Sequence, residues 1–253
     1  MDYLVFQLQA PMAAWGEPAV GEYRGSANHP GESALLGVLA AALGIVRDDE
    51  AALQALQAGY RFAVGVQSAG TLLRDYHTAQ VPSRSDLRGR PHATRADELA
   101  LPRHQLNTIL STRDYRQGSA CLVAVQALAN APHELQALAD ALRTPRFVLY
   151  LGRKACPLAA PLCPQVVASD SARSAFQQYI GLIEARAAPH TDRWGRPAVE
   201  LPAEVRSLSW NDGIEAGVAA QLSAPRKDRV IRRSHWQFGD RMEHRAILTK
   251  GEA

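Results

Sequence analysis

Two short stretches of the chain carry residue types that could bind or cleave a phosphodiester. The first, LGRKACP at 151–157, follows the apolar run 147–150, so Gly152, Arg153 and Lys154 are expected at the end of a strand. Glycine lets backbone approach a ligand closely because it has no Cβ. Arginine offers phosphate a planar fork of donors, and lysine offers a compact charge. The stretch predicts an anion-binding loop, with an ordinary solvated basic turn as the alternative.

The second stretch is Asp75-Tyr76-His77, which together with Lys154 could support RNA cleavage without a metal. In that reaction a His or Tyr base deprotonates the 2′-hydroxyl that attacks the adjacent phosphate, and a lysine stabilises the developing charge. We favour the competing interpretation, in which Tyr76 and His77 end a strand and contact RNA or a neighbouring segment without chemistry.

Other catalytic and metal-binding signatures are absent from the sequence. It contains no GxxxxGK[ST] loop, no GxGxxG after a strand, no HExxH and no GxSxG. The eight histidines lack ligand spacing, and Cys121, Cys156 and Cys163 form no CxxC pair, which argues against a zinc site and a disulfide scaffold. We therefore expect no metal and no cofactor.

The termini and hydropathy predict a cytoplasmic protein. Residues 1–9 lack the basic region and long apolar core of a signal peptide. No apolar stretch reaches the roughly 20 residues that a membrane helix needs.

The basic residues are almost all arginines. The formal net charge is only +3, but Lys154, Lys227 and Lys250 are the only lysines among 28 basic residues, which leaves 25 arginines. Arginine binds phosphate bidentately and stacks on bases, so the bias suits RNA. A GC-rich genome would produce the same bias without any RNA.

The N-terminal half predicts alternating strands and helices. Residues 3–9 alternate as a strand, and a Gly/Pro-rich loop follows to residue 32. Ser33 is the expected N-cap of a helix that Gly44 ends, and a shorter helix is expected at about 49–58. Phe62, Val64 and Val66 indicate the next strand.

Residues 74–118 differ from their surroundings, because many arginines and three prolines interrupt any apolar period until Leu106. We interpret this segment as a projecting arm, in the form of an irregular hairpin.

Regular elements then resume with a strand at 121–125, a helix at 133–143 and a strand at 147–151. The order β-α-β, β-α-β predicts an α+β, ferredoxin-like (RRM-like) split β-α-β domain.

The C-terminal part is less regular. A helix is expected at 172–187, a loop at 189–206, and a basic strand within 226–245 whose shared face includes Val230, Arg232, Ser234 and Trp236. We predict a ferredoxin-like domain over 1–164 with the arm inserted at about 74–118, and a C-terminal extension over 165–253. Trp15, in the loop after the first strand, could stack on a base or pack the loop onto the core.

Six motifs occur in an order that resembles one protein family. They are LQAPMAAWG at 8–16, GESALLGVLAAALG at 31–44, RDD at 47–49, DYHT at 75–78, TRDY at 112–115 and LGRKACP at 151–157. The chain resembles the 5′-handle-binding subunits of Cascade, the type I-E CRISPR surveillance complex (the CasD family of the repeat-associated mysterious protein superfamily). The resemblance extends to about Pro164 and is looser in the basic tail.

The resemblance implies a function in antiviral defence. Such a subunit grips the 5′ handle of the CRISPR RNA (crRNA), crosses it with a β-hairpin thumb beside the first backbone subunit, and helps seat the large subunit that reads the PAM, so target DNA is met only through the complex. Another subunit cuts the precursor RNA in type I-E systems, so this chain is expected to bind and not to cleave. Relatives in type I-C systems do cleave, which keeps a metal-independent endoribonuclease as the alternative.

The expected RNA-binding residues sit at strand ends, at a helix start or on the arm. They are Trp15, Arg24, Ser33, His77, Arg113, Tyr115, Gly152, Arg153, Lys154, Arg232 and Arg233. The backbone N–H groups around Ser33 open a helix, which is a natural phosphate site. Arg116 stands where the family pattern has a leucine, a difference that bears on how the thumb is anchored. The stretch 189–211 has no clear counterpart in the family.

Overall fold

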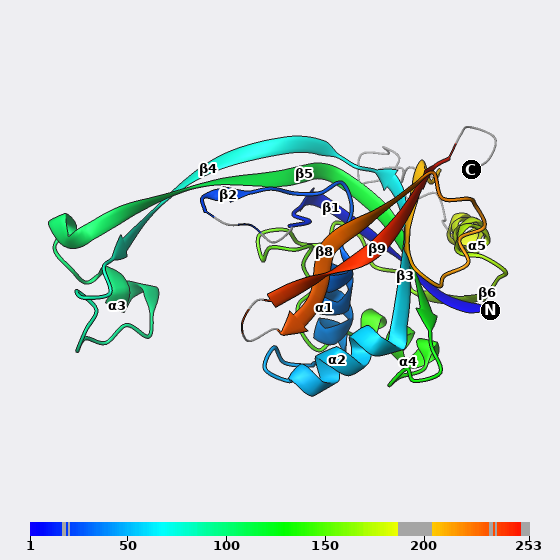
Figure 1. The fold of residues 1–253 in the computed structure, drawn as a ribbon, viewed down its shortest axis with the longest axis horizontal. Helices are drawn as coiled ribbons and strands as arrows, with labels where there is room; N and C mark the ends of the chain where they lie inside the picture. The colour runs from blue at the N-terminus through cyan, green and yellow to red at the C-terminus, as the bar shows by residue number, and fades with distance from the viewer. Residues whose placement is uncertain (17–18, 20, 187–203, 233–234, 236, 249–253) are drawn as a thin grey trace.

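A single sheet organises the chain. The computed structural model describes residues 1–16, 19, 21–186, 204–232, 235 and 237–248 (Figure 1). The strands are β1 (Asp2–Ala13), β2 (Tyr23–Arg24), β3 (Tyr60–Ser68), β4 (Thr71–Pro82), β5 (Leu106–Ala127), β6 (Gln165–Ala168), β7 (Ser207–Asn211), β8 (Leu222–Arg232) and β9 (Gln237–Ile247). The helices are α1 (Glu32–Leu43), α2 (Glu50–Gly59), α3 (Arg95–Leu99), α4 (Leu135–Arg143) and α5 (Ala172–Arg186), with a 3-10 turn η1 (Arg103–Gln105). The predicted α+β class is confirmed.

Strands that are distant in sequence are neighbours in the sheet. The strand order is β6-β1-β5-β3-β7-β9-β8, and every neighbouring pair along this path is antiparallel. β4 pairs with the far half of β5, and β2 pairs with β5 in parallel. Because β6 to β9 belong to the same sheet as β1, the sheet crosses residue 164, and the domain boundary placed there stays a prediction.

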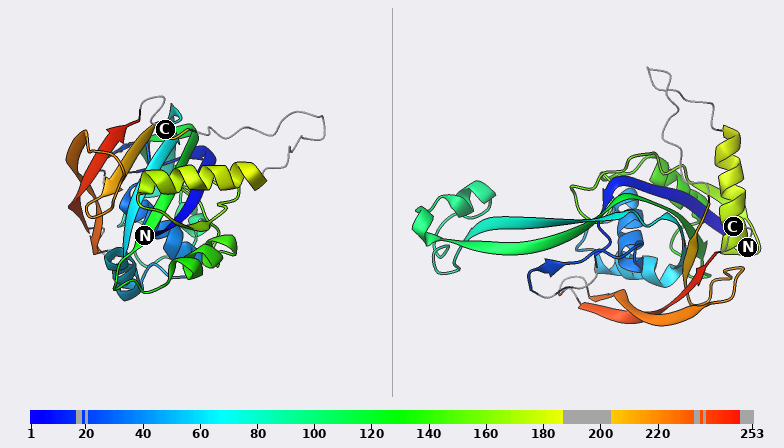
Figure 2. Two further views of the ribbon diagram at one scale, coloured as in Figure 1. Left: turned by 90° about the vertical axis from the view of Figure 1, so that its right-hand side faces the viewer. Right: turned by 90° about the horizontal axis from the view of Figure 1, so that it is seen from above.

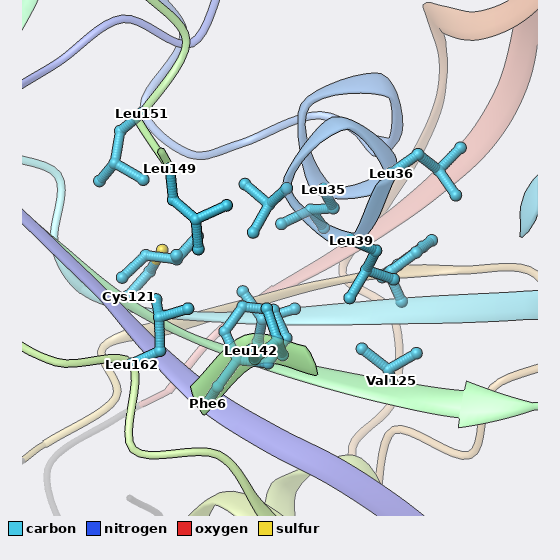
Figure 3. Close-up of a cluster of buried hydrophobic side chains, with 14 of the residues drawn as sticks. Phe6, Leu35, Leu36, Leu39, Cys121, Val125, Leu142, Leu149, Leu151 and Leu162 are labelled. Carbon is cyan, nitrogen blue, oxygen red and sulfur yellow. The ribbon is translucent and has the colours of Figure 1, made fainter. Parts of the chain in front are cut away.

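Apolar side chains cover both faces of the sheet. On one face Leu4, Phe6 and Leu8 pack with α1, α2 and α4 (Figure 3). On the other face Tyr3 and Val5 pack with α5, which lies across the opposite side of the sheet (Figure 2). The central strands are therefore buried on both sides, and the core holds two apolar layers.

Helix ends follow local sequence rules with one exception. Gly44 ends α1 in the left-handed conformation at φ 79°, as predicted, and the Asp49 carboxylate caps α2 by accepting the Ala52 N–H at 3.0 Å. The prediction that Ser33 caps α1 is wrong, because Gly31 is the N-cap and makes no side-chain capping bond. The Glu32 N–H instead donates to Asp228 of β8 at 2.9 Å, a partner that local sequence cannot reveal.

The arm is a longer and more regular hairpin than the sequence indicates. β4 and β5 pair without interruption from Thr71 opposite Gln117 to Pro82 opposite Leu106, and form a thumb that projects from the body with α3 at its tip (Figures 1 and 2). A two-stranded ribbon has no core face, so its strands need no apolar alternation. The strand predicted at 121–125 is the sheet end of the same 22-residue strand, β5.

The strand predicted at 147–151 is wrong. Its backbone bonds go elsewhere, since the Arg146 and Phe147 N–H groups donate to the Ala42 and Ala41 carbonyls at the end of α1. Only an isolated bridge from Tyr150 to Pro157 remains, and Val148 is 87% exposed. The position beside β1 is taken by β6, a strand that the sequence did not indicate.

Further predictions concern the helices and the basic tail. α4 begins two residues later than predicted, and α5 matches the predicted helix. The basic tail forms two paired strands, β8 and β9, instead of one; Ser234 and Trp236, expected on its shared face, lie outside the described residues. No helix in the described part of the chain combines the length and apolar character needed to cross a bilayer.

Candidate nucleic-acid interface

A large cavity brings several of the predicted residues together. It has a volume of about 1020 Å³ and lies between the end of β1, β2, the first half of α1, the loop at 148–153 and the β8–β9 hairpin. Its lining includes Arg24, Ser33, Gly152, Arg153, Lys227 and Phe238. Four of these were predicted, and Lys227 and Phe238 were not.

Gly152 is required by the protein's own backbone. Its φ is +86°, and a Cβ at this position would overlap the carbonyl oxygen of Ala14. The Ala14 N–H in turn donates to the Leu151 carbonyl at 3.0 Å, so the loop is docked onto the end of β1. The sequence predicted that backbone at Gly152 would approach a ligand closely. In the structure the close approach is to the Ala14 carbonyl, and it shapes the wall of the cavity.

Arg153 joins three segments at the base of the thumb. Its guanidinium donates to the Asp114 carbonyl at 3.1 Å and to the Arg24 carbonyl at 3.3 Å, and lies 4.5 Å from the centre of the Tyr115 ring. Tyr115 is buried beneath it, which corrects its expected place on the binding surface. Two donor groups of Arg153 are thus used inside the protein, so fewer remain for a phosphate than we expected.

Trp15 belongs to the core. Its side chain is 1% exposed, and its indole N–H donates to the Ser119 hydroxyl at 3.4 Å. Of the two roles predicted for Trp15, packing the loop onto the core is correct, and stacking on an RNA base is not available to it.

A polar cluster fixes β2 to the thumb. The Tyr23 hydroxyl donates to Asp114 at 2.5 Å, and the Arg74 guanidinium donates to the same carboxylate at 2.9 Å. The hydrogen bond from Arg74 is the main reason that the pKa of Asp114 lies below its ordinary value, and the bond to Asp114 raises the pKa of Tyr23. The motif TRDY was noticed in the sequence, but its partners come from distant segments.

Arg116, the departure from the family pattern, is a second anchor. Its guanidinium donates to the Ala27 and Ser26 carbonyls at 3.2 Å each. It therefore ties the segment after β2 to the thumb base, where a leucine could offer no donor.

The remaining basic candidates lie on the thumb or at exposed strand ends. Arg24 sits opposite Arg113 in the β2–β5 pair, so two guanidinium groups lie on adjacent strands. Arg232 is exposed at the end of β8, and Arg233 lies outside the described residues. Lys154 is exposed beside the cavity loop.

The residues considered for RNA cleavage do not meet in the cavity. Its lining contains neither Tyr76, His77 nor Lys154. His77 lies on β4 with its Nε2 atom 2.5 Å from the Asp75 carboxylate. The cavity therefore does not bring together the base and the lysine that the sequence suggested.

A buried ion network joins β8 and β9, and no pattern in the sequence indicated it. Arg226 and Arg241 bridge Asp228 and Glu243, with N–O distances from 2.6 to 3.2 Å, and all four are at most one-tenth exposed on their side chains. Glu32 at the start of α1 accepts from Asn211 at 2.7 Å. Arg226 and Arg241 therefore balance internal carboxylates, and their guanidinium groups are occupied inside the protein.

The network predicts acid sensitivity. Burial alone would raise the pKa of the Glu243 carboxyl, but contacts with His29 and Arg226 outweigh burial and hold it well below its ordinary value of 4.5. An acid with a depressed folded pKa stabilises the fold above its unfolded pKa, and that contribution is lost as the pH falls towards the folded value. Unfolding free energy, measured in urea, should therefore drop as the pH falls below 4.5. The unfolding free energy of the Glu243→Gln variant should drop less steeply over the same pH range. Parallel curves of unfolding free energy against pH for the variant and the wild type would contradict the role given to Glu243.

Three comparisons with known proteins bear on this geometry. The family model described as CRISPR-associated protein (Cas_Cas5) matches residues 3–241. The protein named CRISPR system Cascade subunit CasD of Escherichia coli (strain K12) is 33% identical over 225 residues, which cover 83% of this chain and 94% of that protein.

Two solved structures share the fold. A chain of a structure titled CRISPR RNA-guided surveillance complex matches with a TM-score of 0.61 at 24% identity and covers 97% of this chain and 89% of its own length. A structure titled Crystal structure of Cas protein matches with a TM-score of 0.57 at 23% identity. The match covers 99% of this chain and 97% of the chain in that structure.

Proposed function

Because the chain belongs to the CRISPR-associated Cas_Cas5 family, we propose that it is a non-catalytic subunit of a Cascade complex that holds the 5′ handle of the crRNA. The handle lies in the cavity between α1, β2, the loop at 148–153 and the β8–β9 hairpin. The observation that carries this proposal is the convergence of Arg24, Arg153 and the start of α1 at Ser33 on one large cavity. Cations that converge on a concave surface suit a polyanion that must be held in one path.

The thumb supports the proposed placement within a complex. It projects from the body and carries Arg84, Arg88, Arg90, Arg95 and Arg103 at or near its tip. A basic ribbon that reaches beyond the cavity is suited to cross the RNA beside a backbone subunit. The large PAM-reading subunit and, through the complex, target DNA complete the proposed partners.

The strand order supports the ferredoxin-like assignment. The segment β6-β1-β5-β3 has the order of a split β-α-β sheet when β6 is taken as the fourth strand, with α1 and α4 on one face. We assign the ferredoxin-like unit to β1, α1, β3, β5, α4 and β6. The cavity then opens beside α1.

Arg24→Ala is the sharpest single test of the proposed site. Arg24 is exposed, and its bonds to the Ala19, Gly21 and Tyr23 carbonyls all come from Nη1, whereas Arg153 uses both Nη1 and Nη2 for backbone carbonyls. Losing one arginine–phosphate contact should weaken binding of handle-bearing crRNA by about tenfold and reduce its salt dependence. Fluorescence anisotropy at several salt concentrations measures both quantities.

The matched control is Arg173→Ala, which removes one positive charge from α5 on the opposite face of the sheet. Equal losses for the two variants would refute a localised site. Repeat RNA incubated with the protein in EDTA provides the test of catalysis, since cleaved product would favour the endoribonuclease alternative.

A further inference from the structure

The β8–β9 hairpin forms a wall of the cavity through Lys227 and Phe238, which were not among the RNA-binding residues predicted in the basic tail. We infer that this hairpin is the second half of the RNA site: Phe238 stacks on a base, and Lys227 contacts a neighbouring phosphate. The inference rests on the proposed function and assigns two further binding residues within it.

A β-bulge sets the direction of Lys227. Arg226 pairs with Arg241 and Arg229 pairs with Gly239, so three steps along β8 correspond to two steps along β9. The extra residue falls within Lys227–Asp228. Bulges bend a strand and redirect its side chains, and they are frequent beside functional sites. Here the bulged segment presents Lys227 to the cavity.

The two neighbours of Lys227 hold it in place. Arg226 and Asp228 are buried on either side, with Arg226 paired to Glu243 at 2.9 Å. Asp228 receives the Glu32 N–H at 2.9 Å, so β8 is fixed to the start of α1. Lys227 is exposed, and none of the described residues forms a hydrogen bond or ion pair with its ammonium group. A cation fixed at its backbone and unpaired at its head is suited to bind an anion.

Phe238 supplies an aromatic ring on the same wall. It pairs with Val230 across the hairpin, is half-buried and lines the cavity. Among the described residues of the lining, Tyr150 is also aromatic, but it belongs to the loop at 148–153, where Arg153 already donates to two backbone carbonyls. Single-stranded RNA is held by aromatic stacking together with backbone cations. Phe238 thus takes the role that the buried Trp15 cannot.

The two roles predict different signatures in a salt titration of handle-bearing RNA with the full-length chain. Lys227→Ala should weaken binding by about tenfold and lower the slope of log affinity against log salt by about 0.7, the value for one phosphate on a single strand. Lys227→Arg should restore both. Phe238→Leu keeps an apolar side chain of similar size, so it should weaken binding by roughly tenfold with the slope unchanged, and Phe238→Tyr should restore it.

Controls separate this inference from the proposed function. Arg173→Ala marks the effect of one charge on the opposite face, and thermal melting of each variant checks that it is folded. Suppose that wild-type protein binds handle-bearing RNA, and that the folded variants Lys227→Ala and Phe238→Leu bind it as tightly as Arg173→Ala does. The role of the hairpin is then overturned, and the proposed function stands. If wild-type protein does not prefer RNA with the handle over RNA without it, the proposed function and this inference both fail.

Discussion

Gly152→Ala is expected to destabilise the chain by roughly 3 kcal/mol and to abolish binding of handle-bearing RNA. A non-glycine residue at positive φ costs on the order of 1–3 kcal/mol, and φ here is +86°. The new Cβ would also overlap the Ala14 carbonyl oxygen, which is backbone and cannot rotate away. The loop must then leave β1, which breaks the hydrogen bond from Ala14 to Leu151.

Loss of RNA binding should follow because Arg153 is the next residue. Once the loop moves, the Arg153 guanidinium can no longer reach the Asp114 and Arg24 carbonyls. The hydrogen bonds that hold the thumb base and β2 in position are then lost. Urea denaturation and RNA anisotropy measure the two effects. Gly181→Ala is the control, since Gly181 lies within α5 with open space at its Cβ position, and alanine there should stabilise by about 0.5–1 kcal/mol. Wild-type stability in Gly152→Ala would contradict the docking of the loop.

Asp228→Ala is expected to cost about 3–5 kcal/mol of folding free energy, the range for removing one partner of a buried ion pair. The carboxylate receives Arg241 at 2.6 Å and Arg226 at 3.2 Å, so its removal leaves two buried guanidinium groups beside less negative charge. It also leaves the Glu32 N–H at the start of α1 without its acceptor.

The control for Asp228→Ala is Asp240→Ala, on the paired strand. Asp240 is exposed, so its removal should change stability by less than about 0.5 kcal/mol. Chemical denaturation of both variants at neutral pH decides the matter. If both variants lose little folding free energy, the buried network contributes little to stability. If only Asp228→Ala loses about 3–5 kcal/mol, as expected, Asp228 is the residue that attaches β8 to α1.

Local signals predicted the elements that depend on local physics. The alternation of 3–9, the end of a helix at Gly44 and the short helix at about 49–58 each depend on neighbours in sequence, and β1, α1 and α2 formed as expected. The strand at 147–151 was predicted from an apolar run, but a strand also requires a hydrogen-bonding partner, and Val148 of that run is 87% exposed. Here the backbone bonds of 146–147 are used by the end of α1.

The site was only partly predictable for the same reason. Arg24 and Ser33 were predicted because strand ends and helix starts often face ligands. Gly152 and Arg153 were predicted at the end of a strand that does not form, yet all four residues line the cavity. Tyr115 was misplaced, and both roles of Trp15 stayed open, because an aromatic residue has the same local pattern whether it is buried or exposed. The ion network was missed because the basic tail carries no local sign that Arg226 and Arg241 are buried against carboxylates of the same hairpin. The start of α1, which covers Asp228, is 196 residues away in sequence.

The pairing of β5 determines how the thumb can move. Its ladder with β4 extends to Gln117, and its ladder with β1 begins at Arg116, so two sets of hydrogen bonds overlap at the thumb base. The bend at Gly118, with φ 67°, lies between residues that are paired to β1 on either side. The thumb therefore has no hinge at its root. It deforms as an elastic ribbon clamped at one end, so displacement is greatest at the tip and load on the tip is carried directly into the central strand of the sheet.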